Sequence, residues 1–297
     1  MILITGATGR IGRRVVERLV AADHDVRVLI RSFDKAERLL PARDIDIIVG
    51  DLGDIDAVSS AVNGVDSILL VSPVSPDQVK LQGNIVRAAI NQQSTPYIVK
   101  ISGLMTTLES YVDCGRWHAE TEQQIKDTGL AYTFLRPLFF MQNLAFLLKS
   151  AKLDGVIRAG VADAKIAMID AEDIARVAAL LLIEKAPLMN QAVELTSLES
   201  VSYTEIASAL SELLGREVRY EARSLAQVKQ ALIDAKQPEW HTNILLQFNR
   251  AFQEGQGSAT NNVVSDLLGR TPTTLKQYLE RELEDAERDE SNNPFPS

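Results

Sequence analysis

Short apolar runs alternate with amphipathic stretches along the first two thirds of the chain. Residues 2–4 are apolar at successive positions, which is typical of a strand buried on both faces of a parallel sheet. From Ile11 the apolar positions recur at helical spacing, with arginine and glutamate on the opposite side. The alternation continues and predicts strands at residues 26–30, 45–49, 67–71, 97–101 and 132–136 and helices at residues 55–62, 78–91 and 111–126. This order of strands and helices predicts an α/β fold with a doubly wound parallel sheet.

The pattern changes after residue 137. Residues 139–151 are apolar and rich in phenylalanine, which predicts a helix that either lines a hydrophobic cavity or packs as an ordinary core helix. The remaining apolar positions predict strands at residues 156–159, 165–169, 191–196 and 217–221, an apolar helix capped by residues 170–173 that reaches Ile183, and helices at residues 225–235, 243–254 and 273–284.

A turn punctuated by glycines joins the first predicted strand to the first helix. Gly6, Gly9 and Gly12 allow a tight reversal, a close backbone approach by a phosphate, and close packing of the helix on the sheet. The N-terminus of the helix adds unpaired N–H groups and a partial positive charge. The strand before and the helix after this turn favour a dinucleotide site of the Rossmann type over a plain strand–helix turn.

The end of the second predicted strand indicates which dinucleotide is preferred. An acidic side chain at this place holds a ribose 2′-hydroxyl, whereas an arginine can pair with a 2′-phosphate. Arg31 occupies the place, with Ser32 and Lys35 close behind it. We therefore predict NADP (NADPH) as the cofactor. The alternative is that Arg31 is a solvated charge and that the protein discriminates little between NADP and NAD.

These features suggest three parts of the chain. We expect an NADP-binding Rossmann domain over residues 1–198, with residues 139–165 contributing to its substrate side. A smaller, mostly helical substrate-side domain should cover residues 199–284. Residues 285–297 are polar and contain proline, which favours a disordered tail.

Composition narrows the class of protein. The chain has 297 residues, of which 46% are hydrophobic and 24% charged, as in an ordinary soluble protein. A net charge of -9 disfavours nucleic acid and anionic membranes as partners. The single cysteine, Cys114, excludes an internal disulfide and a multi-cysteine metal site. Because Met1 leads directly into a strand and no apolar run is long enough to span a bilayer, we expect a cytoplasmic protein. We also expect a monomer or homodimer, and no metal.

Five stretches form a combined signature: residues 4–12, Arg31, residues 50–52, the Val-Lys-Ile-Ser-Gly of residues 99–103, and the Leu-Arg-Pro-Leu-Phe-Phe-Met-Gln-Asn of residues 135–143. Together they resemble the atypical short-chain dehydrogenase/reductases and, within these, the NmrA-like family. That family includes NADPH-dependent quinone and triphenylmethane-dye reductases, relatives of the isoflavone reductases, and redox-sensing regulators. The resemblance is good over residues 1 to about 200 and only general beyond.

The resemblance implies positions for the cofactor. It brings the stretch after the sixth strand near the nicotinamide, and with it Arg136 and Asn143. From the glycine turn, the strand ends and the resemblance together, the predicted cofactor-binding residues are Gly6, Thr8, Gly9, Arg10, Ile11, Gly12, Arg31, Ser32, Lys35, Asp51, Leu52, Val71, Ser72, Ser102, His118, Pro137 and Phe140.

The chain departs from the usual short-chain reductase at the proton donor. Most such enzymes carry a Tyr-x-x-x-Lys pair on the helix after the fifth strand, with the tyrosine as donor. Those two positions hold Cys114 and His118 here. Tyr111 lies one turn earlier and could replace the tyrosine only in a different helix register, and Ser102 matches the hydroxyl that usually stands beside it.

Three interpretations of Cys114 and His118 remain open. His118 could take the place of the lysine as ribose contact or proton donor, because imidazole titrates near neutrality. The pair could form a redox-sensitive thiol. Cys114 could also be a small buried apolar residue beside a merely hydrogen-bonded His118. We favour the last interpretation for Cys114 and the first for His118. His24 and His241 have no neighbouring groups in sequence that suggest a site.

The sequence thus predicts an NADPH-dependent reductase that passes hydride to a conjugated small molecule, aromatic or quinone-like, with His118 and Ser102 as the catalytic residues. A non-catalytic NADP(H)-binding redox sensor that reports to a partner protein is the alternative. An epimerase or dehydratase of nucleotide-sugars suits the fold but lacks the tyrosine, and it ranks last.

Overall fold

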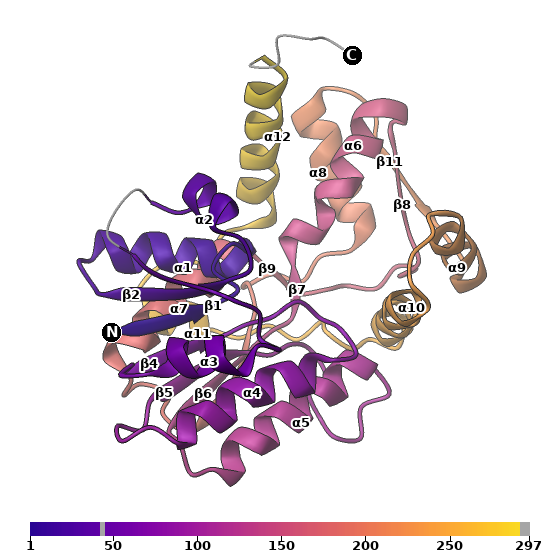
Figure 1. Cartoon of the computed structure of the whole chain (residues 1–297). Helices are drawn as coiled ribbons and strands as arrows, with labels where there is room; N and C mark the ends of the chain where they lie inside the picture. Colours follow the sequence, from indigo (N-terminus) through magenta and orange to yellow (C-terminus); the bar gives the residue numbers. More distant parts are fainter. Residues whose placement is uncertain (42–44, 292–297) are drawn as a thin grey trace. The chain divides into compact units, whose positions relative to one another are not determined.

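The central feature of the computed structural model is a seven-stranded sheet in which every neighbouring pair of strands is parallel (Figure 1). The structure describes residues 1–41 and 45–291. The strand order is β10-β6-β5-β4-β1-β2-β3, which confirms the predicted doubly wound sheet. The strands are β1 (Ile2–Thr5), β2 (Val26–Ile30), β3 (Asp46–Val49), β4 (Ser67–Leu70), β5 (Tyr97–Ile101), β6 (Tyr132–Pro137) and β10 (Gln191–Leu195).

Helices cover both faces of this sheet because the strand order reverses between β1 and β4. One face carries α1 (Arg10–Ala21) and α7 (Ala171–Glu184), which pack on each other. The other face carries α3 (Ile55–Val62), α4 (Gln78–Ile90) and α5 (Asp113–Asp127). A short helix, α2 (Phe33–Leu39), follows β2. Ligands bind at the carboxyl ends of such strands, beside the point where the order reverses.

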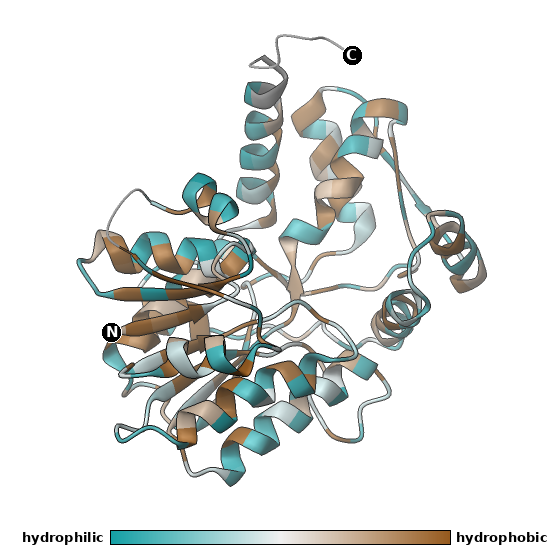
Figure 2. Ribbon diagram, in the orientation of Figure 1, coloured by the Kyte–Doolittle hydropathy of each residue, from teal (hydrophilic) through white to brown (hydrophobic). Residues whose placement is uncertain are grey.

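The core between the sheet and helices α3 to α5 is apolar. Strand side chains of β1, β4, β5 and β6 meet helix side chains there, and Figure 2 shows the hydrophobic strands beneath helices that are striped along their length. This pattern explains why the spacing of apolar residues along the sequence predicted these strands and helices well. Fully or nearly fully buried members of this core are Leu3, Val58, Ile68, Leu70, Ile85, Ile98, Ile125 and Phe134.

The chain divides into two compact units. The first contains residues Met1–Pro137, Ala171–Leu195 and Asp266–Gly269, and the second contains residues Leu138–Asp170, Thr196–Ser265 and Arg270–Ser297. The elements of the second unit are β7 (Phe139–Phe140), the 3-10 helix η1 (Met141–Leu144), α6 (Ala145–Asp154), β8 (Val156–Ala159), β9 (Met168–Ile169), α8 (Tyr203–Leu214), β11 (Arg219–Ala222), α9 (Leu225–Asp234), α10 (Glu239–Gln253) and α12 (Leu275–Ser291), and α11 (Val263–Leu268) has residues in both units.

Three local expectations were wrong in the second unit. The predicted helix over residues 139–151 begins instead as β7, which pairs with β9, and becomes α-helical only at Ala145. The predicted strand over residues 165–169 is reduced to the two residues of β9. The part of the expected tail that precedes residue 292 belongs to α12, and residues 292–297 lie outside the described residues.

Inside the second unit, a buried carboxylate holds two segments together. Asp170 accepts a 2.7 Å hydrogen bond from Nε2 of Gln142 and a 2.7 Å bond from Arg281 on α12. The side chain of Asp170 is completely buried, and a buried charge is tolerated only when it is paired and hydrogen-bonded. Within the described part of the chain, no helix has the length and apolarity that a membrane crossing requires.

Candidate active site

The glycine turn follows β1 and closes tightly. Gly6 has a φ of +61°, and a Cβ there would lie 2.9 Å from Cγ1 of Val71. A Cβ on Gly12 would lie 2.3 Å from the carbonyl oxygen of Gly6, closer than any side chain permits. The amide of Gly9 donates to the same carbonyl at 2.9 Å. Both Gly6 and Gly12 are therefore required by the local geometry.

The start of α1 suits an anionic group. Its N-cap, Gly9, offers no side-chain acceptor to the first N–H groups, and its first turn contains no acidic residue. The unpaired N–H groups and the helix dipole therefore favour a phosphate here. Gly9 and Arg10 are exposed, whereas Ile11 is buried under the turn. These observations fit the dinucleotide that the sequence predicts.

Thr5 fixes the turn to the neighbouring strand. Its hydroxyl oxygen lies 3.0 Å from the carbonyl oxygen of Leu69 and 2.8 Å from that of Val71, and its one hydrogen can be donated to either. The same hydroxyl accepts from the amide of Val71 at 2.8 Å. Thr5 is completely buried and was not among the predicted site residues. It lies beside the point of strand reversal and brings Val71 against Gly6.

The predicted selectivity residues follow β2 and β3. Arg31 is exposed and has no ion-pair partner within residues 1–41 and 45–291. The Ser32 hydroxyl caps α2 by accepting from the amide of Lys35 at 3.4 Å. Asp51 accepts from the amide of Gly53 at 2.9 Å in the loop after β3. This end of the sheet thus presents an arginine and a lysine toward solvent, as a 2′-phosphate would need.

The remaining predicted residues lie at other strand ends or in the second unit. Thr8 belongs to the glycine turn, and Leu52 lies in the loop after β3. Ser72 lies just after β4, and its hydroxyl accepts a hydrogen bond from Nε2 of Gln82 at 2.8 Å. Pro137 is the last residue of β6. Phe140 and Asn143 belong to the second unit, in β7 and η1.

A buried polar cluster lies at the carboxyl ends of β5 and β6, under α4 and α5. At its centre, Nζ of Lys100 lies 2.9 Å from Nδ1 of His118 and 2.9 Å from Oγ of Ser102. Nε2 of Gln78, at the start of α4, lies 3.0 Å from the same Nδ1. All four side chains are buried, although β5 is otherwise a plain apolar strand. Burying a charged residue in such a strand costs free energy unless the charge is paired and hydrogen-bonded.

The cluster continues to an ion pair. Ser102 donates its hydroxyl hydrogen to Oε1 of Glu122 at 2.7 Å, so both hydrogen-bonding functions of this hydroxyl are used. Arg136 on β6 binds both oxygens of Glu122, through Nε at 3.1 Å to Oε1 and through a terminal nitrogen to Oε2. The bidentate pair anchors the cluster to β6.

Burial controls the charges in the cluster. Desolvation lowers the pKa of Lys100 to about 7, against the opposing attraction of Glu122. Desolvation, reinforced by the charges of Lys100 and Arg136, lowers the pKa of His118 well below its usual range. His118 is therefore neutral at physiological pH. Since an ammonium can only donate, Nδ1 of His118 is an acceptor and its ring hydrogen is on Nε2.

The Nε2 edge of the buried His118 ring faces the loop after β5. A Cβ placed on Gly103 would lie 3.5 Å from both Nε2 and Cδ2 of His118, so this edge of the ring lies against the loop. Among the described residues, no protein group hydrogen-bonds to Nε2. The N–H of His118 is thus the hydrogen-bond donor of the imidazole that the described contacts leave without an acceptor.

Cys114 and Tyr111 differ from His118 in their surroundings. Cys114 is buried, as expected, and burial raises the pKa of its thiol to about 12. That environment disfavours the thiolate that redox chemistry requires. Helix α5 begins at Asp113, so Tyr111 precedes it and is partly exposed, outside the helical face that carries His118.

Sequence reasoning did not identify Lys100, Gln78 or Glu122 as site residues. A signal for Lys100 was present, because a lysine interrupts a strand that is apolar at every other position of residues 97–101. Gln78 carried no such signal, since glutamine at the start of a helix is ordinary. No group of metal-ligand side chains occurs within residues 1–41 and 45–291.

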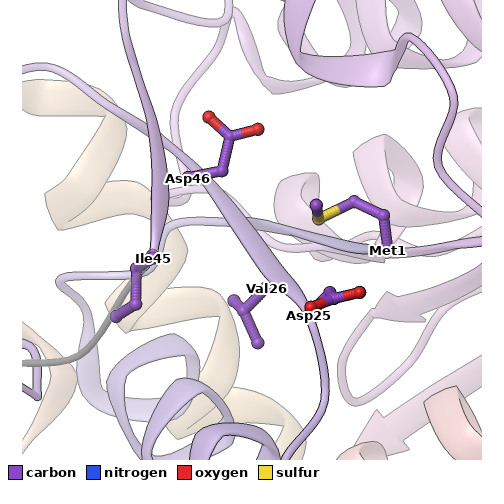
Figure 3. A pocket seen from close by; sticks show the side chains of 5 residues that line it. All are labelled: Met1, Asp25, Val26, Ile45 and Asp46. Atoms are coloured by element: carbon purple, nitrogen blue, oxygen red, sulfur yellow. The ribbon is translucent and has the colours of Figure 1, made fainter.

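A pocket whose lining residues are drawn in Figure 3 lies at the end of the strands opposite to the candidate site. It has a volume of about 280 Å³ and lies at the amino ends of β1, β2 and β3. Ligands in this fold bind at the carboxyl ends, and Asp46 is already paired with Arg27 at 2.6 Å. The pocket is therefore separate from the candidate site. It is lined by Met1, Asp25, Val26, Ile45 and Asp46.

The sheet order, the glycine turn and the strand-end arginine define a Rossmann-type NADP-binding protein. The chain belongs to the NmrA-like family, whose sequence profile matches residues 1–279. The resemblance noted in the sequence is thereby confirmed, and the match extends well beyond residue 200.

Named relatives and solved structures agree with this assignment. The chain is 38% identical over 239 residues to an NAD(P)H azoreductase of Xenophilus azovorans, covering 80% of this chain and 82% of the relative. It resembles the Escherichia coli NADPH-dependent quinone oxidoreductase in complex with NADPH, with 29% identity, a TM-score of 0.86, and coverage of 95% of this chain and 100% of the other. The triphenylmethane reductase of Citrobacter sp. with NADP(H) gives 26% identity, a TM-score of 0.83, and coverage of 95% and 99%.

Proposed function

We propose that this protein is an NADPH-dependent reductase that passes hydride to a conjugated small molecule such as a quinone or an azo compound. The observation that carries the proposal is the pairing of a phosphate-binding turn with a neutral histidine N–H at the same edge of the sheet. The relatives, which reduce azo compounds and quinones according to their names, support it.

The chain's own residues divide the work of binding. The backbone of Gly6, Gly9 and Gly12 and the N–H groups at the start of α1 hold the pyrophosphate. Arg31 pairs with the 2′-phosphate. Bound NADPH supplies the hydride. His118 donates a proton through Nε2 to the atom that gains negative charge, and Ser102 helps to hold the cluster in place.

The nature of the proton donor favours a conjugated acceptor. When a quinone or an azo compound takes a hydride, the charge is spread over a conjugated oxygen or nitrogen, so a weak donor such as neutral imidazole is sufficient. A simple ketone becomes a localised alkoxide, for which the usual tyrosine–lysine pair is better suited. The replacement of that pair by Cys114 and His118 supports the first class of substrate.

A turnover screen tests the proposal. NADPH oxidation is followed at its nicotinamide absorbance with quinones, azo dyes, triphenylmethane dyes, enones and simple ketones. We expect turnover of quinones or dyes well above that of ketones. Equal rates with all acceptors would contradict the proposed substrate class, and tight NADPH binding without any turnover would favour the redox-sensor alternative.

We also propose that the enzyme works in the cytoplasm as a monomer or homodimer. The single, buried cysteine supports a reducing compartment. Fractionation of cells and sedimentation of the purified protein test these two points, and a larger assembly or an exported protein would contradict them.

A further inference from the structure

We propose that Lys100 is the positioning residue of the site: its ammonium fixes His118 as a neutral Nε2–H donor and replaces the proton that His118 gives away. The proton-replacing step rests on the proposed reductase function, whereas the fixed state of the imidazole does not. Lys100 lies in a strand that is otherwise apolar, and nothing in the fold requires a charge there.

The surroundings of Lys100 are those of an ammonium group. Three acceptors surround Nζ: Oγ of Ser102 at 2.9 Å, Nδ1 of His118 at 2.9 Å and the carbonyl oxygen of Ile101 at 3.5 Å. The oxygen of Ser102 can only accept from Lys100, because its hydrogen is given to Glu122. Three N–H groups thus meet three acceptors, and the imidazole is one of them.

A second donor reinforces the choice of tautomer. Nε2 of Gln78 also points at Nδ1 of His118, at 3.0 Å. The Oε1 atom of Gln78 is buried without a hydrogen-bond partner among the described residues. Such an atom costs about 1–3 kcal/mol, so the orientation is retained against a stability penalty. Rotating the amide would place Oε1 at Nδ1, which suits only the tautomer that Lys100 excludes.

The charges around His118 oppose its protonation. Lys100 on β5 and Arg136 on β6 are cationic, and Glu122 on α5 is the one carboxylate that the described contacts place in the cluster. Helix α4 contributes the neutral Gln78. A proton added to His118 would raise the net charge of a buried group that is already positive. The imidazole therefore remains neutral while Lys100 holds the available proton.

The proton step is balanced. When Nε2–H of His118 gives its proton to the anionic oxygen or nitrogen of the reduced acceptor, Nδ1 takes a proton from the Lys100 ammonium. The Nε2–H bond and one N–H bond of Lys100 break, while a bond to the product and an Nδ1–H bond form. Afterwards Nε2 takes a proton from water and Nδ1 returns its own to Lys100. One solvent proton is consumed for each hydride delivered.

The first test needs neither cofactor nor activity. The chain has three histidines, so ¹⁵N-histidine labelling gives a spectrum simple enough to follow His118 in the full-length protein. We expect His118 to show hydrogen on Nε2 and none on Nδ1 between about pH 6 and pH 7, where Lys100 still carries its proton in half or more of the molecules. Hydrogen on Nδ1 in the wild-type protein would overturn the proposal.

Variants of Lys100 extend this test. In Lys100→Met the loss of the charge should raise the pKa of His118 by about one unit or more. Lys100→Gln, which keeps an N–H donor without the charge, should keep the Nε2–H tautomer and show the same rise. Lys80→Met, the same substitution at an exposed position of α4, is the matched control and should leave His118 unchanged. An unchanged titration in both Lys100 variants would refute the role.

The second test is kinetic. With NADPH and a quinone, kcat of the wild-type protein should fall as the pH rises past about 7, where Lys100 loses its proton. Lys100→Met should lower kcat about tenfold or more near neutral pH, leave KM for the quinone little changed, and abolish that pH dependence. Retention of both kcat and the pH dependence would contradict the proton-replacing role. Absence of turnover in the wild-type protein would instead refute the proposed function, and the histidine spectra alone would then decide the role of Lys100.

Discussion

Replacing Lys100 by methionine should change how the free energy of unfolding depends on pH. Burial lowers the pKa of this lysine from its ordinary 10.5 to about 7. Because one pKa unit corresponds to 1.36 kcal/mol, protonated Lys100 lowers the stability by about 5 kcal/mol at most. Between these two pKa values the unfolded chain binds more protons than the folded protein, so stability rises with pH in this window.

The measurable part of this effect lies between about pH 7 and pH 9. The difference in proton binding by Lys100 between the folded and unfolded states raises the wild-type free energy of unfolding by about 2 kcal/mol over that range. Urea unfolding, followed by circular dichroism at both pH values, measures it. Lys100→Met also raises the pKa of His118, but that pKa starts well below its ordinary value, so His118 titrates below this pH range in both proteins. The difference between wild type and Lys100→Met between about pH 7 and pH 9 therefore isolates the lysine.

The difference in pH dependence, rather than the absolute stability, is the readout, because methionine also removes hydrogen bonds to Ser102 and His118. Lys80→Met should follow the wild-type curve. If Lys100→Met and the wild-type protein gain stability in parallel between about pH 7 and pH 9, the lysine titrates normally, and the reasoning about its burial is refuted.

Three further outcomes are expected. Arg31→Ala should weaken NADPH binding about tenfold or more and leave NADH binding nearly unchanged, since one charged partner of the 2′-phosphate is lost; equal losses in fluorescence titrations would contradict this. Gly12→Ala should impair dinucleotide binding and cost about 1–3 kcal/mol of stability, because its Cβ would lie 2.3 Å from the carbonyl oxygen of Gly6; a variant that binds normally would show that the turn can relax. Cys114 should resist iodoacetamide near pH 8 in the folded protein and react in urea, because it is buried and its pKa is raised to about 12; rapid labelling of the folded protein would refute this.

The parallel sheet could be predicted because its strands are apolar and its helices amphipathic. The dinucleotide-binding turn could be predicted from the same pattern. Glycines at positions 6, 9 and 12 lie between a predicted strand and a predicted helix, and recognising this does not require the tertiary structure. Arg31 could be placed by counting onward to the next strand end. These residues depend on local sequence, which a periodicity argument captures.

The proton-donating cluster could not be predicted in the same way. Its members come from β5 and the residue that follows it, from β6, from the start of α4 and from the middle of α5. Gln78 and His118 are 40 positions apart, and only the packing of α4 beside α5 brings them together. The resemblance to the short-chain reductases suggested His118, because it stands where those enzymes carry the lysine. Lys100, the partner that determines the tautomer of His118, is identified only by the fold.

Two of the three wrong predictions in the second unit have physical causes that can be read from the sequence. Phe139 and Phe140 belong to a continuous apolar run, which does not distinguish a strand from a buried helix. The end of α12 is polar and therefore suggested disorder, yet pairs spaced like Glu284 and Arg288, 3.4 Å apart, support a solvent-exposed helix.

The order of strands in the central sheet also has a consequence for synthesis on the ribosome. β10 pairs with β6, but Tyr132 and its partner Asn190 at this junction are 58 positions apart, and part of the second unit is translated between them. Until β10 emerges, β6 is an edge strand with unpaired backbone groups, which is a site for wrong pairing between nascent chains. A chain ended after residue 190 should therefore form larger aggregates than the complete chain, and light scattering during translation of the two chains would compare them. The edge strand that completes the sheet thus also ends the period in which the growing protein is vulnerable.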